Sequence, residues 1–248
     1  MADRQRPRSS PPTGKPSQVP FKPPSKPTRD RRRFTLLLVI GLVIAVGGAL
    51  TAATLRNNRP SAQPAAPAAA AAAPVVRDSS HRLSTAPDGK VTFVEFLDFE
   101  CEGCKAVYPV IEQLRTQYEG RVTFVIRYFP LDSHFNAVRA ARAVEAAAQQ
   151  GQLEAMYQKM YDTQTEWGEQ QTPADDTFAG FAADLGLDVT RWTADYNSPA
   201  TLARVEVDRA DGTALGLTGT PSFFVNGDKL EPESVDDLTT ALDDALAR

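Results

Sequence analysis

The amino-acid sequence predicts an α/β domain that contains a helical insertion and is preceded by one transmembrane helix. Three observations lead to this prediction: an uncharged apolar stretch at residues 34–55, strand-like and helical segments that alternate within residues 81–248, and a mostly helical region at about residues 134–212. Alternating strands and helices are typical of α/β domains, and residues 81–248 are long enough to form one sizeable core. We therefore expect one folded domain that is tethered to a membrane.

The apolar stretch, FTLLLVIGLVIAVGGALTAATL, is long enough to cross a bilayer. A helix of this length spans roughly 33 Å, and the hydrocarbon core is about 30 Å thick. A cleaved signal peptide is the alternative, because residues 51–53 offer a small-residue cleavage site. Signal peptides have a shorter apolar region of about 7–15 residues, so we expect an uncleaved anchor. Arg31, Arg32 and Arg33 precede the stretch, which predicts a cytoplasmic N-terminus and an extracytoplasmic domain.

The segments on either side of the anchor differ in composition from the folded domain. Residues 1–33 carry ten basic and two acidic side chains, although the formal net charge of the chain is −4. They are rich in proline and poor in large apolar side chains, which predicts a disordered basic cytoplasmic tail. Residues 56–80 are rich in alanine and proline and predict a linker. The domain has no basic patch with interleaved aromatic residues, which argues against nucleic-acid binding.

The elements of the domain follow from its apolar runs and turn residues. Runs rich in valine, isoleucine and phenylalanine predict strands, alanine-rich amphipathic stretches predict helices, and an Asn-Gly pair predicts a tight turn. In order, we expect a strand at 91–97, a helix at 101–118, a strand at 121–129, the helical insertion at about 134–212, a short strand at 221–225, a turn at 226–227 and a final helix at 234–246.

The only two cysteines of the chain lie in the sequence CEGC at residues 101–104. A structural zinc site needs four ligands, and His81 and His134 are too scattered to supply the missing two, so no metal site is expected. Two interpretations of His134 are open: it caps or orients the insertion, or it is a satisfied surface histidine, and we favour the surface histidine. A structural disulfide across so short a loop would restrict the unfolded chain little. The pair is predicted at the start of a helix, where backbone N–H groups and the helix dipole stabilise a thiolate, which favours a redox-active dithiol.

Further positions match a known family. Glu95 lies six positions before Cys101, Pro109 interrupts the helix that follows, and GTPSF at residues 219–223 leads into a predicted strand. Together with CEGC, these features resemble the active-site region and the cis-proline loop of the thioredoxin superfamily. The roughly 90 residues between the second strand and this loop are similar to the insertion of the DsbA-like branch, whose members are extracytoplasmic thiol–disulfide oxidoreductases. The resemblance covers about residues 85–248 and implies a thioredoxin-like fold with a helical insertion.

The resemblance implies roles for five residues and no cofactor. Cys101 would form a mixed disulfide with the substrate, and Cys104 would resolve it. Glu95, buried beneath the pair, would transfer a proton to or from Cys104. Pro221, if its peptide bond is cis, would present its backbone to an extended substrate peptide, and Thr220 could form a hydrogen bond near the sulfur.

One departure concerns the two residues between the cysteines. The strongly oxidising DsbA enzymes have proline and histidine there, whereas this chain has Glu102 and Gly103. No imidazolium lies between the cysteines, and Asp98 and Glu100 add negative charge nearby. Like charges disfavour a further negative charge, so we predict a higher Cys101 pKa and a less oxidising disulfide than in those enzymes.

These observations predict a membrane-anchored thiol–disulfide oxidoreductase that forms disulfides in cysteine-containing exported proteins. The resemblance implies reoxidation by a quinone-linked membrane partner. Two alternatives stay open: an anchored thiol reductase, for example one that serves cytochrome maturation, and a non-catalytic tethered binding module in which the cysteine pair is structural.

Overall fold

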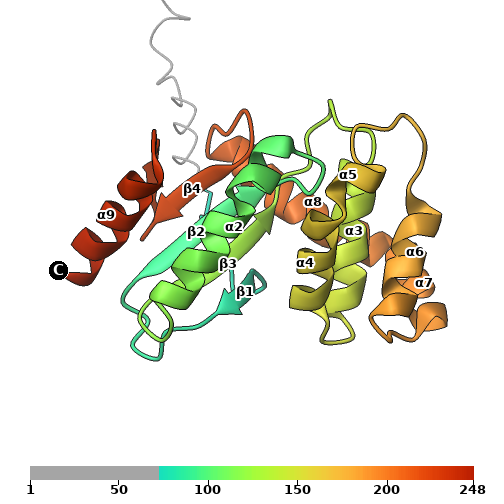
Figure 1. Ribbon diagram of the computed structural model, residues 1–248, viewed down its shortest axis with the longest axis horizontal. Coiled ribbons are helices and arrows are strands. Elements are labelled where there is room, and N and C mark those ends of the chain that lie inside the picture. Colours follow the sequence, from blue (N-terminus) through green and yellow to red (C-terminus); the bar gives the residue numbers. More distant parts are fainter. Residues whose placement is uncertain (1–72) are drawn as a thin grey trace, which may run out of the picture. The chain divides into compact units, whose positions relative to one another are not determined.

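The computed structural model describes residues 73–248 of the chain (Figure 1). The predicted cytoplasmic tail, the predicted membrane anchor and most of the predicted linker lie outside these residues. Within residues 73–248, no helix is both long enough and apolar enough to cross a bilayer.

A five-stranded sheet forms the centre of the domain, with the strand order β1-β3-β2-β4-β5. Strands β2 and β3 are parallel, and the other neighbouring pairs are antiparallel. The strand bounds are β1 His81–Ser84, β2 Thr92–Leu97, β3 Thr123–Tyr128, β4 Ser222–Val225 and β5 Asp228–Leu230. The sequence predicted β2, β3 and β4 but missed β1, whose sequence HRLS contains a single large apolar residue.

Helix α2 (Glu102–Gln117) connects β2 to β3 and packs on one face of the sheet. Because side chains alternate along a strand, Phe93, Glu95 and Leu97 point toward the α2 face, and Val94 and Phe96 point to the other face. The apolar members of these two sets lie in separate core clusters. Strand β2 is therefore buried on both faces, as its nearly continuous apolar sequence predicts.

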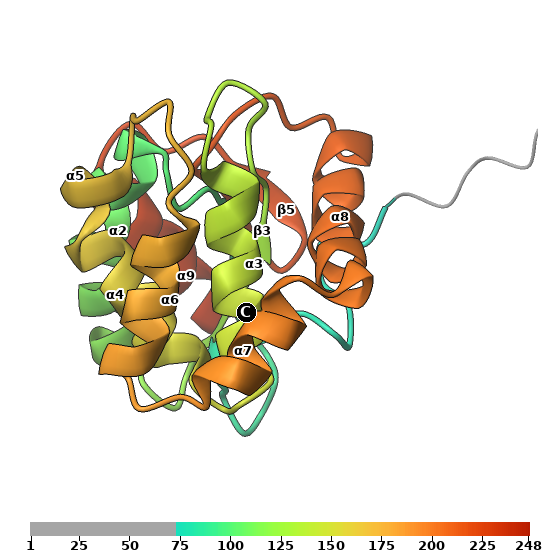
Figure 2. The same ribbon diagram turned by 90° about the vertical axis from the view of Figure 1, so that its right-hand side faces the viewer.

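A helical insertion separates β3 from β4, as predicted (Figure 1). Its helices are α3 Ala137–Ala148, α4 Leu153–Asp162, α5 Gln164–Trp167, α6 Asp175–Asp184, α7 Val189–Tyr196 and α8 Pro199–Ala214. Helix α3 buries an alanine-rich face, where small side chains allow close packing of neighbouring helices. Helix α8 packs against β3 and lies on the opposite side of the sheet from α2 (Figure 2).

The chain ends in the predicted hairpin and helix. Asn226 and Gly227 both have positive φ angles, 51° and 92°, as a two-residue hairpin turn of the primed type requires. Helix α9 (Val235–Leu246) begins with a capping box in which the side chains of Ser234 and Asp237 each accept from the other residue's backbone N–H.

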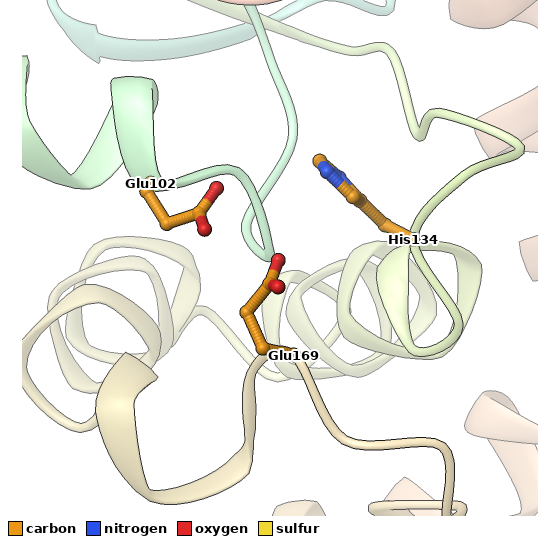
Figure 3. A group of neighbouring side chains, drawn as sticks. All are labelled: Glu102, His134 and Glu169. Carbon is orange, nitrogen blue, oxygen red and sulfur yellow. The ribbon is translucent and has the colours of Figure 1, made fainter.

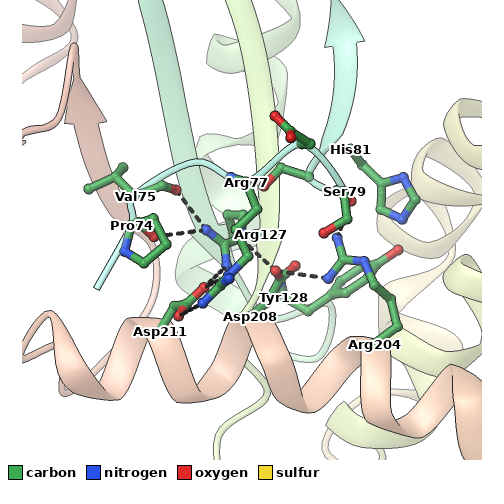
Figure 4. Close-up of polar contacts among 12 residues, drawn as sticks. Pro74, Val75, Arg77, Ser79, His81, Arg127, Tyr128, Arg204, Asp208 and Asp211 are labelled. Carbon is green, nitrogen blue, oxygen red and sulfur yellow. Dashed lines mark hydrogen bonds and ion pairs between the residues drawn. The ribbon is translucent and has the colours of Figure 1, made fainter. Parts of the chain in front are cut away.

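Residues 74–80, which the sequence analysis assigned to the linker, contact the domain (Figure 4). Arg127 of β3 is fully buried, and its guanidinium donates to the carbonyl oxygens of Pro74 and Val75 at 3.2 and 2.8 Å. The same guanidinium pairs with the carboxylates of Asp208 and Asp211 on α8. A buried charge is tolerated only when it is paired and hydrogen-bonded, so this segment completes the surroundings of Arg127.

Candidate active site

Cys101 lies at the carboxyl edge of the sheet, between β2 and α2. It is the N-cap residue of α2 with an extended backbone, and its N–H donates to the carbonyl oxygen of Asp98 at 3.2 Å. Cys104 lies one helical turn further on and is fully buried, whereas Cys101 keeps 8% of its surface exposed. Both cysteines are free thiols. Only the Cys101 sulfur can therefore be reached from solvent.

The loop before β4 completes the site from the other side. The Sγ atom of Cys101 lies 3.4 Å from the carbonyl oxygen of Thr220. The Thr220–Pro221 peptide bond is cis, as the sequence analysis expected. A Cβ atom on Gly103 would lie 3.3 Å from the Pro221 ring and 3.5 Å from the Cys101 sulfur, so a glycine lets the two loops approach closely. The fold thus brings together Cys101, Cys104, Gly103, Thr220 and Pro221.

The two thiols have opposite electrostatic environments. The hydrogen bond from the Cys104 thiol makes the largest contribution in lowering the pKa of Cys101 to about 5, against the opposing effect of burial. Thr220 and the backbone N–H groups of Gly103 and Cys104 lower this pKa further. Burial raises the pKa of Cys104 well above its ordinary value, and the hydrogen bond with Cys101 adds to this effect. The arrangement places a stabilised thiolate beside a buried thiol that stays protonated.

Glu95 lies in the middle of β2 and is 3% exposed. Burial raises its pKa to about 8, and the negative charge of Cys101 contributes in the same direction. Glu95 in turn raises the pKa of Cys104. At neutral pH this carboxyl group is therefore mostly protonated and electrostatically coupled to both cysteines.

Asp98 and Glu100, which the sequence analysis expected to repel a thiolate, instead organise the loops around the site. The Asp98 carboxylate accepts from the N–H groups of Glu100 and Leu131 at 2.8 and 2.9 Å. Glu100 is 1% exposed. Its carboxylate accepts from the N–H groups of Asn136 and Glu169 at 2.5 and 3.1 Å, and so joins two loops of the insertion.

The causes of the lowered Cys101 pKa differ from those that the sequence suggested. A value of about 5 lies above the ~3.5 of DsbA and below the ~7 of thioredoxin. The hydrogen bonds to the sulfur determine this pKa. The carboxyl groups of Asp98 and Glu100 have raised pKa values themselves, primarily because they are buried. The sequence positions of Asp98 and Glu100 therefore led to an overestimate of the negative charge that these residues place near the Cys101 sulfur.

The interpretation of His134 as a surface histidine was wrong. Its side chain is 15% exposed, and its Nδ1 atom lies 2.7 Å from the Asp98 carboxylate. Burial opposes the charged form, but the hydrogen bond and the charge of Asp98 outweigh it and raise the pKa of His134; the charge of Cys101 acts in the same direction. The sequence held a usable signal: His134 follows β3, which is parallel to β2, so both strands end at the same edge of the sheet.

Gln164 is a second residue that the sequence analysis missed. It is 4% exposed, lies at the start of α5, and donates to the backbone carbonyl oxygens of Phe99 and Cys101 at 2.7 and 3.0 Å. The helical insertion thus forms direct hydrogen bonds with the backbone of the loop that carries Cys101.

Comparison with known proteins places this architecture in a family. A model of the thioredoxin family matches residues 81–244. The thioredoxin-like oxidoreductase of Silicibacter pomeroyi has a similar structure, with a TM-score of 0.58 and 28% identity over 69% of this chain and 95% of that one. Wolbachia pipientis α-DsbA1 superposes with a TM-score of 0.62 at 18% identity, over 69% of this chain and 93% of that one. Bacillus subtilis BdbD superposes with a TM-score of 0.61 at 19% identity, over 68% of this chain and 94% of that one.

The curated relatives are longer proteins. The Na⁺/H⁺ antiporter NhaA of Herminiimonas arsenicoxydans is 37% identical over 147 residues, which are 58% of this chain and 22% of that protein. NhaA 1 of Mycolicibacterium gilvum is 31% identical over 204 residues, which are 80% of this chain and 31% of that protein. The chain therefore spans between a fifth and a third of the length of these relatives.

The match over residues 81–244, the cysteine pair at the start of α2 and the cis-proline loop lead to one conclusion. The chain belongs to the thioredoxin family and has the fold of its DsbA-like thiol–disulfide oxidoreductases.

Proposed function

We propose that this thiol–disulfide oxidoreductase forms disulfide bonds in exported, cysteine-containing proteins through Cys101 and Cys104. The observation that carries the proposal is the contrast between the two thiols: the pKa of Cys101 is lowered to about 5, and that of Cys104 is raised well above its ordinary value. A stabilised thiolate favours the reduced form of the pair. The disulfide form is then a good acceptor of electrons from other dithiols.

The first step is attack by a substrate thiolate on the Cys101 sulfur, because the Cys104 sulfur is fully buried. A bond forms between the substrate sulfur and Cys101, and the Cys101–Cys104 bond breaks. Cys104 is a poor leaving group as a thiolate because its pKa is raised. Glu95, whose pKa is about 8, supplies the proton that Cys104 takes up.

The second step releases the product. A second substrate thiolate attacks the substrate sulfur in the mixed disulfide, and the bond to Cys101 breaks. Cys101 leaves as a thiolate, which the Cys104 thiol and the surrounding N–H groups stabilise. Two electrons and two protons in total pass from the substrate dithiol to the cysteine pair and its surroundings, so the enzyme must be reoxidised before the next cycle.

The cis-proline loop provides a place for the substrate chain. Residues 219–221 are half-buried beside Cys101 and precede β4. An extended peptide that pairs with this backbone would present its cysteine sulfur to Cys101. Binding through main-chain hydrogen bonds suits an enzyme that accepts many substrate sequences.

The proposal includes a location and an electron acceptor. Residues 34–55 anchor the chain in the cell membrane, the arginines at 31–33 keep the N-terminus in the cytoplasm, and the domain works outside it. A quinone-linked membrane protein removes the electrons. A membrane-impermeant thiol reagent should label Cys101 in intact cells that have been treated with a reductant, and labelling only after lysis would contradict this topology.

The deciding experiment is the reduction potential of the full-length chain in glutathione buffers, with Cys101→Ser as the inactive control. A value above about −180 mV, with catalysed oxidation of a reduced protein substrate that the control lacks, supports disulfide formation. A value near or below about −250 mV makes the disulfide a poor oxidant and points to the anchored reductase instead. Equal substrate oxidation by the Cys101→Ser control would instead support the alternative of a non-catalytic tethered binding module.

A further inference from the structure

We propose that Glu102, His134 and Glu169 form a binding site for a divalent transition-metal cation of the Zn²⁺ type, next to the cysteine pair. The three residues offer one ring nitrogen and two carboxylate oxygens that all lie within 4.8 Å of one another. They come from the first turn of α2, the loop after β3 and the loop after α5, and their side chains converge (Figure 3).

Neither Glu102 nor Glu169 forms an ion pair with a lysine or arginine of residues 73–248, and His134 pairs with Asp98 rather than with either glutamate. Two carboxylates that converge without a lysine or arginine partner repel each other. A bound dication would compensate both charges at once.

The Nδ1 atom of His134 is held 2.7 Å from Asp98, whose carboxylate is itself held by two backbone N–H groups. This leaves Nε2 as the free nitrogen and fixes the plane of the ring. Metal-bound histidines almost always use their second nitrogen in such a contact with a carboxylate, carbonyl or water.

Glu169 lies in the loop after α5. Its backbone has a φ of 58°, in the left-handed region that few residues other than glycine adopt. The hydrogen bond from its N–H to the buried carboxylate of Glu100 holds this backbone in place. The position of the third ligand is therefore set by the fold, while its side chain stays free to turn.

The chemical types of the three ligand atoms favour Zn²⁺ over other divalent cations. One imidazole nitrogen with two carboxylate oxygens is a mixed set that suits Zn²⁺, with a fourth position open, whereas Ca²⁺ prefers oxygen ligands alone. Zn²⁺ bonds of about 2.0–2.2 Å place two ligands no more than about 4.4 Å apart. The side chains of Glu102 and Glu169 are exposed and can close the remaining gap by small rotations.

The test must separate this site from the cysteines, which bind Zn²⁺ themselves when reduced. We would titrate Zn²⁺ into an untagged full-length chain carrying Cys101→Ser and Cys104→Ser, by calorimetry in detergent. We expect one Zn²⁺ per chain, bound at least tenfold more tightly than Ca²⁺. In the same background, His134→Gln and Glu169→Gln should each weaken binding by about tenfold or more.

The matched control is Glu166→Gln, which removes an exposed carboxylate on the neighbouring helix α5 and should leave binding unchanged. Absence of binding at 100-fold excess Zn²⁺, binding that survives both ligand substitutions, or Ca²⁺ binding as tight as Zn²⁺ binding would each overturn the proposal. If His134→Gln fails to fold by circular dichroism, Glu102→Gln and Glu169→Gln decide, since both glutamates lie at the surface.

Discussion

The side-chain amide of Gln164 donates a hydrogen bond of 3.0 Å to the backbone carbonyl oxygen of Cys101. A second hydrogen bond from the same amide, of 2.7 Å, reaches the carbonyl oxygen of Phe99. One side chain of the helical insertion thus donates to two buried acceptors in the loop that carries Cys101. The insertion is therefore a structural support of the redox centre as well as a cover for the sheet.

Gln164→Ala should destabilise the protein and slow thiol exchange. The buried Phe99 carbonyl oxygen would lose its side-chain donor, at a cost of about 1–3 kcal/mol, and the Cys101 carbonyl oxygen would keep only the hydrogen bond from the Lys105 N–H. Denaturant unfolding and the rate of substrate oxidation measure the two effects. Gln170→Ala is the matched control, because the Gln170 amide bonds a carbonyl oxygen at the exposed surface. Equal losses for both variants would contradict the role of Gln164.

Cys104→Ala should raise the pKa of Cys101 clearly above about 5, because the Cys104 thiol makes the largest contribution in lowering it. Cys104→Ser keeps a hydrogen-bond donor at the same position, so its effect should be smaller. The ultraviolet absorbance of the thiolate, titrated against pH, gives both values. An unchanged pKa in the alanine variant would mean that the backbone N–H groups and Thr220 alone stabilise the thiolate.

Glu95→Gln should change how stability depends on pH. The folded pKa of Glu95 is about 8, above its ordinary value of 4.5, so the folded state binds the proton more tightly than the unfolded state does. This contribution is complete below pH 4.5 and is lost as the pH rises through about 8, with a total on the order of 5 kcal/mol. Glutamine does not titrate, so the variant should gain stability relative to wild type across this range.

The measurement for Glu95 is the difference in unfolding free energy between the reduced wild type and reduced Glu95→Gln, from pH 5 to pH 8. Taking the difference removes the opposite contribution of Cys101, whose lowered pKa adds stability as the pH rises. Parallel curves for the two proteins would show that Glu95 does not carry the expected proton.

A fragment that begins at residue 81 should be less stable than one that begins at residue 73. The shorter fragment lacks the Pro74 and Val75 carbonyl oxygens, so the buried Arg127 guanidinium loses two acceptors, at a cost on the order of 3 kcal/mol. Urea unfolding of the two fragments compares them. Arg77→Ala in the longer fragment removes only the exposed ion-pair partner of Asp211. This substitution should lower the free energy of unfolding by less than the truncation does. Equal midpoints for the two fragments would place residues 73–80 outside the stable domain.

Much of the site could be predicted from sequence because its residues lie at recognisable positions along the chain. Cys101 and Cys104 follow a continuous apolar run, and Pro221 precedes a second one. These patterns reflect local structure, in which a strand ends and a helix begins. The position of Glu95 inside the first run marked it as buried, since a carboxyl group within such a strand has no solvent-exposed face.

The remaining features depend on contacts between distant parts of the chain. Gln164 lies 63 residues from Cys101, and nothing in its own neighbourhood marks it as a partner of that loop. His134 lies 36 residues from Asp98, whose carboxylate changes its surroundings. Residues 74 and 75 bind Arg127 through backbone carbonyl oxygens, which every residue type has, so their composition could not reveal the contact. Strand β1 forms because β3 offers a free edge to pair with.

The contact between Cys101 and Thr220 joins positions that are 119 residues apart. During synthesis from the N-terminus, the chain therefore emerges with both cysteines long before the loop that closes over them. Until that loop arrives, Cys101 lacks the contribution of Thr220 to its lowered pKa, whereas the largest contribution comes from Cys104, three residues away in the chain. The cysteine pair is therefore synthesised early, but the loop that closes over Cys101 is added only when almost the whole domain has been made.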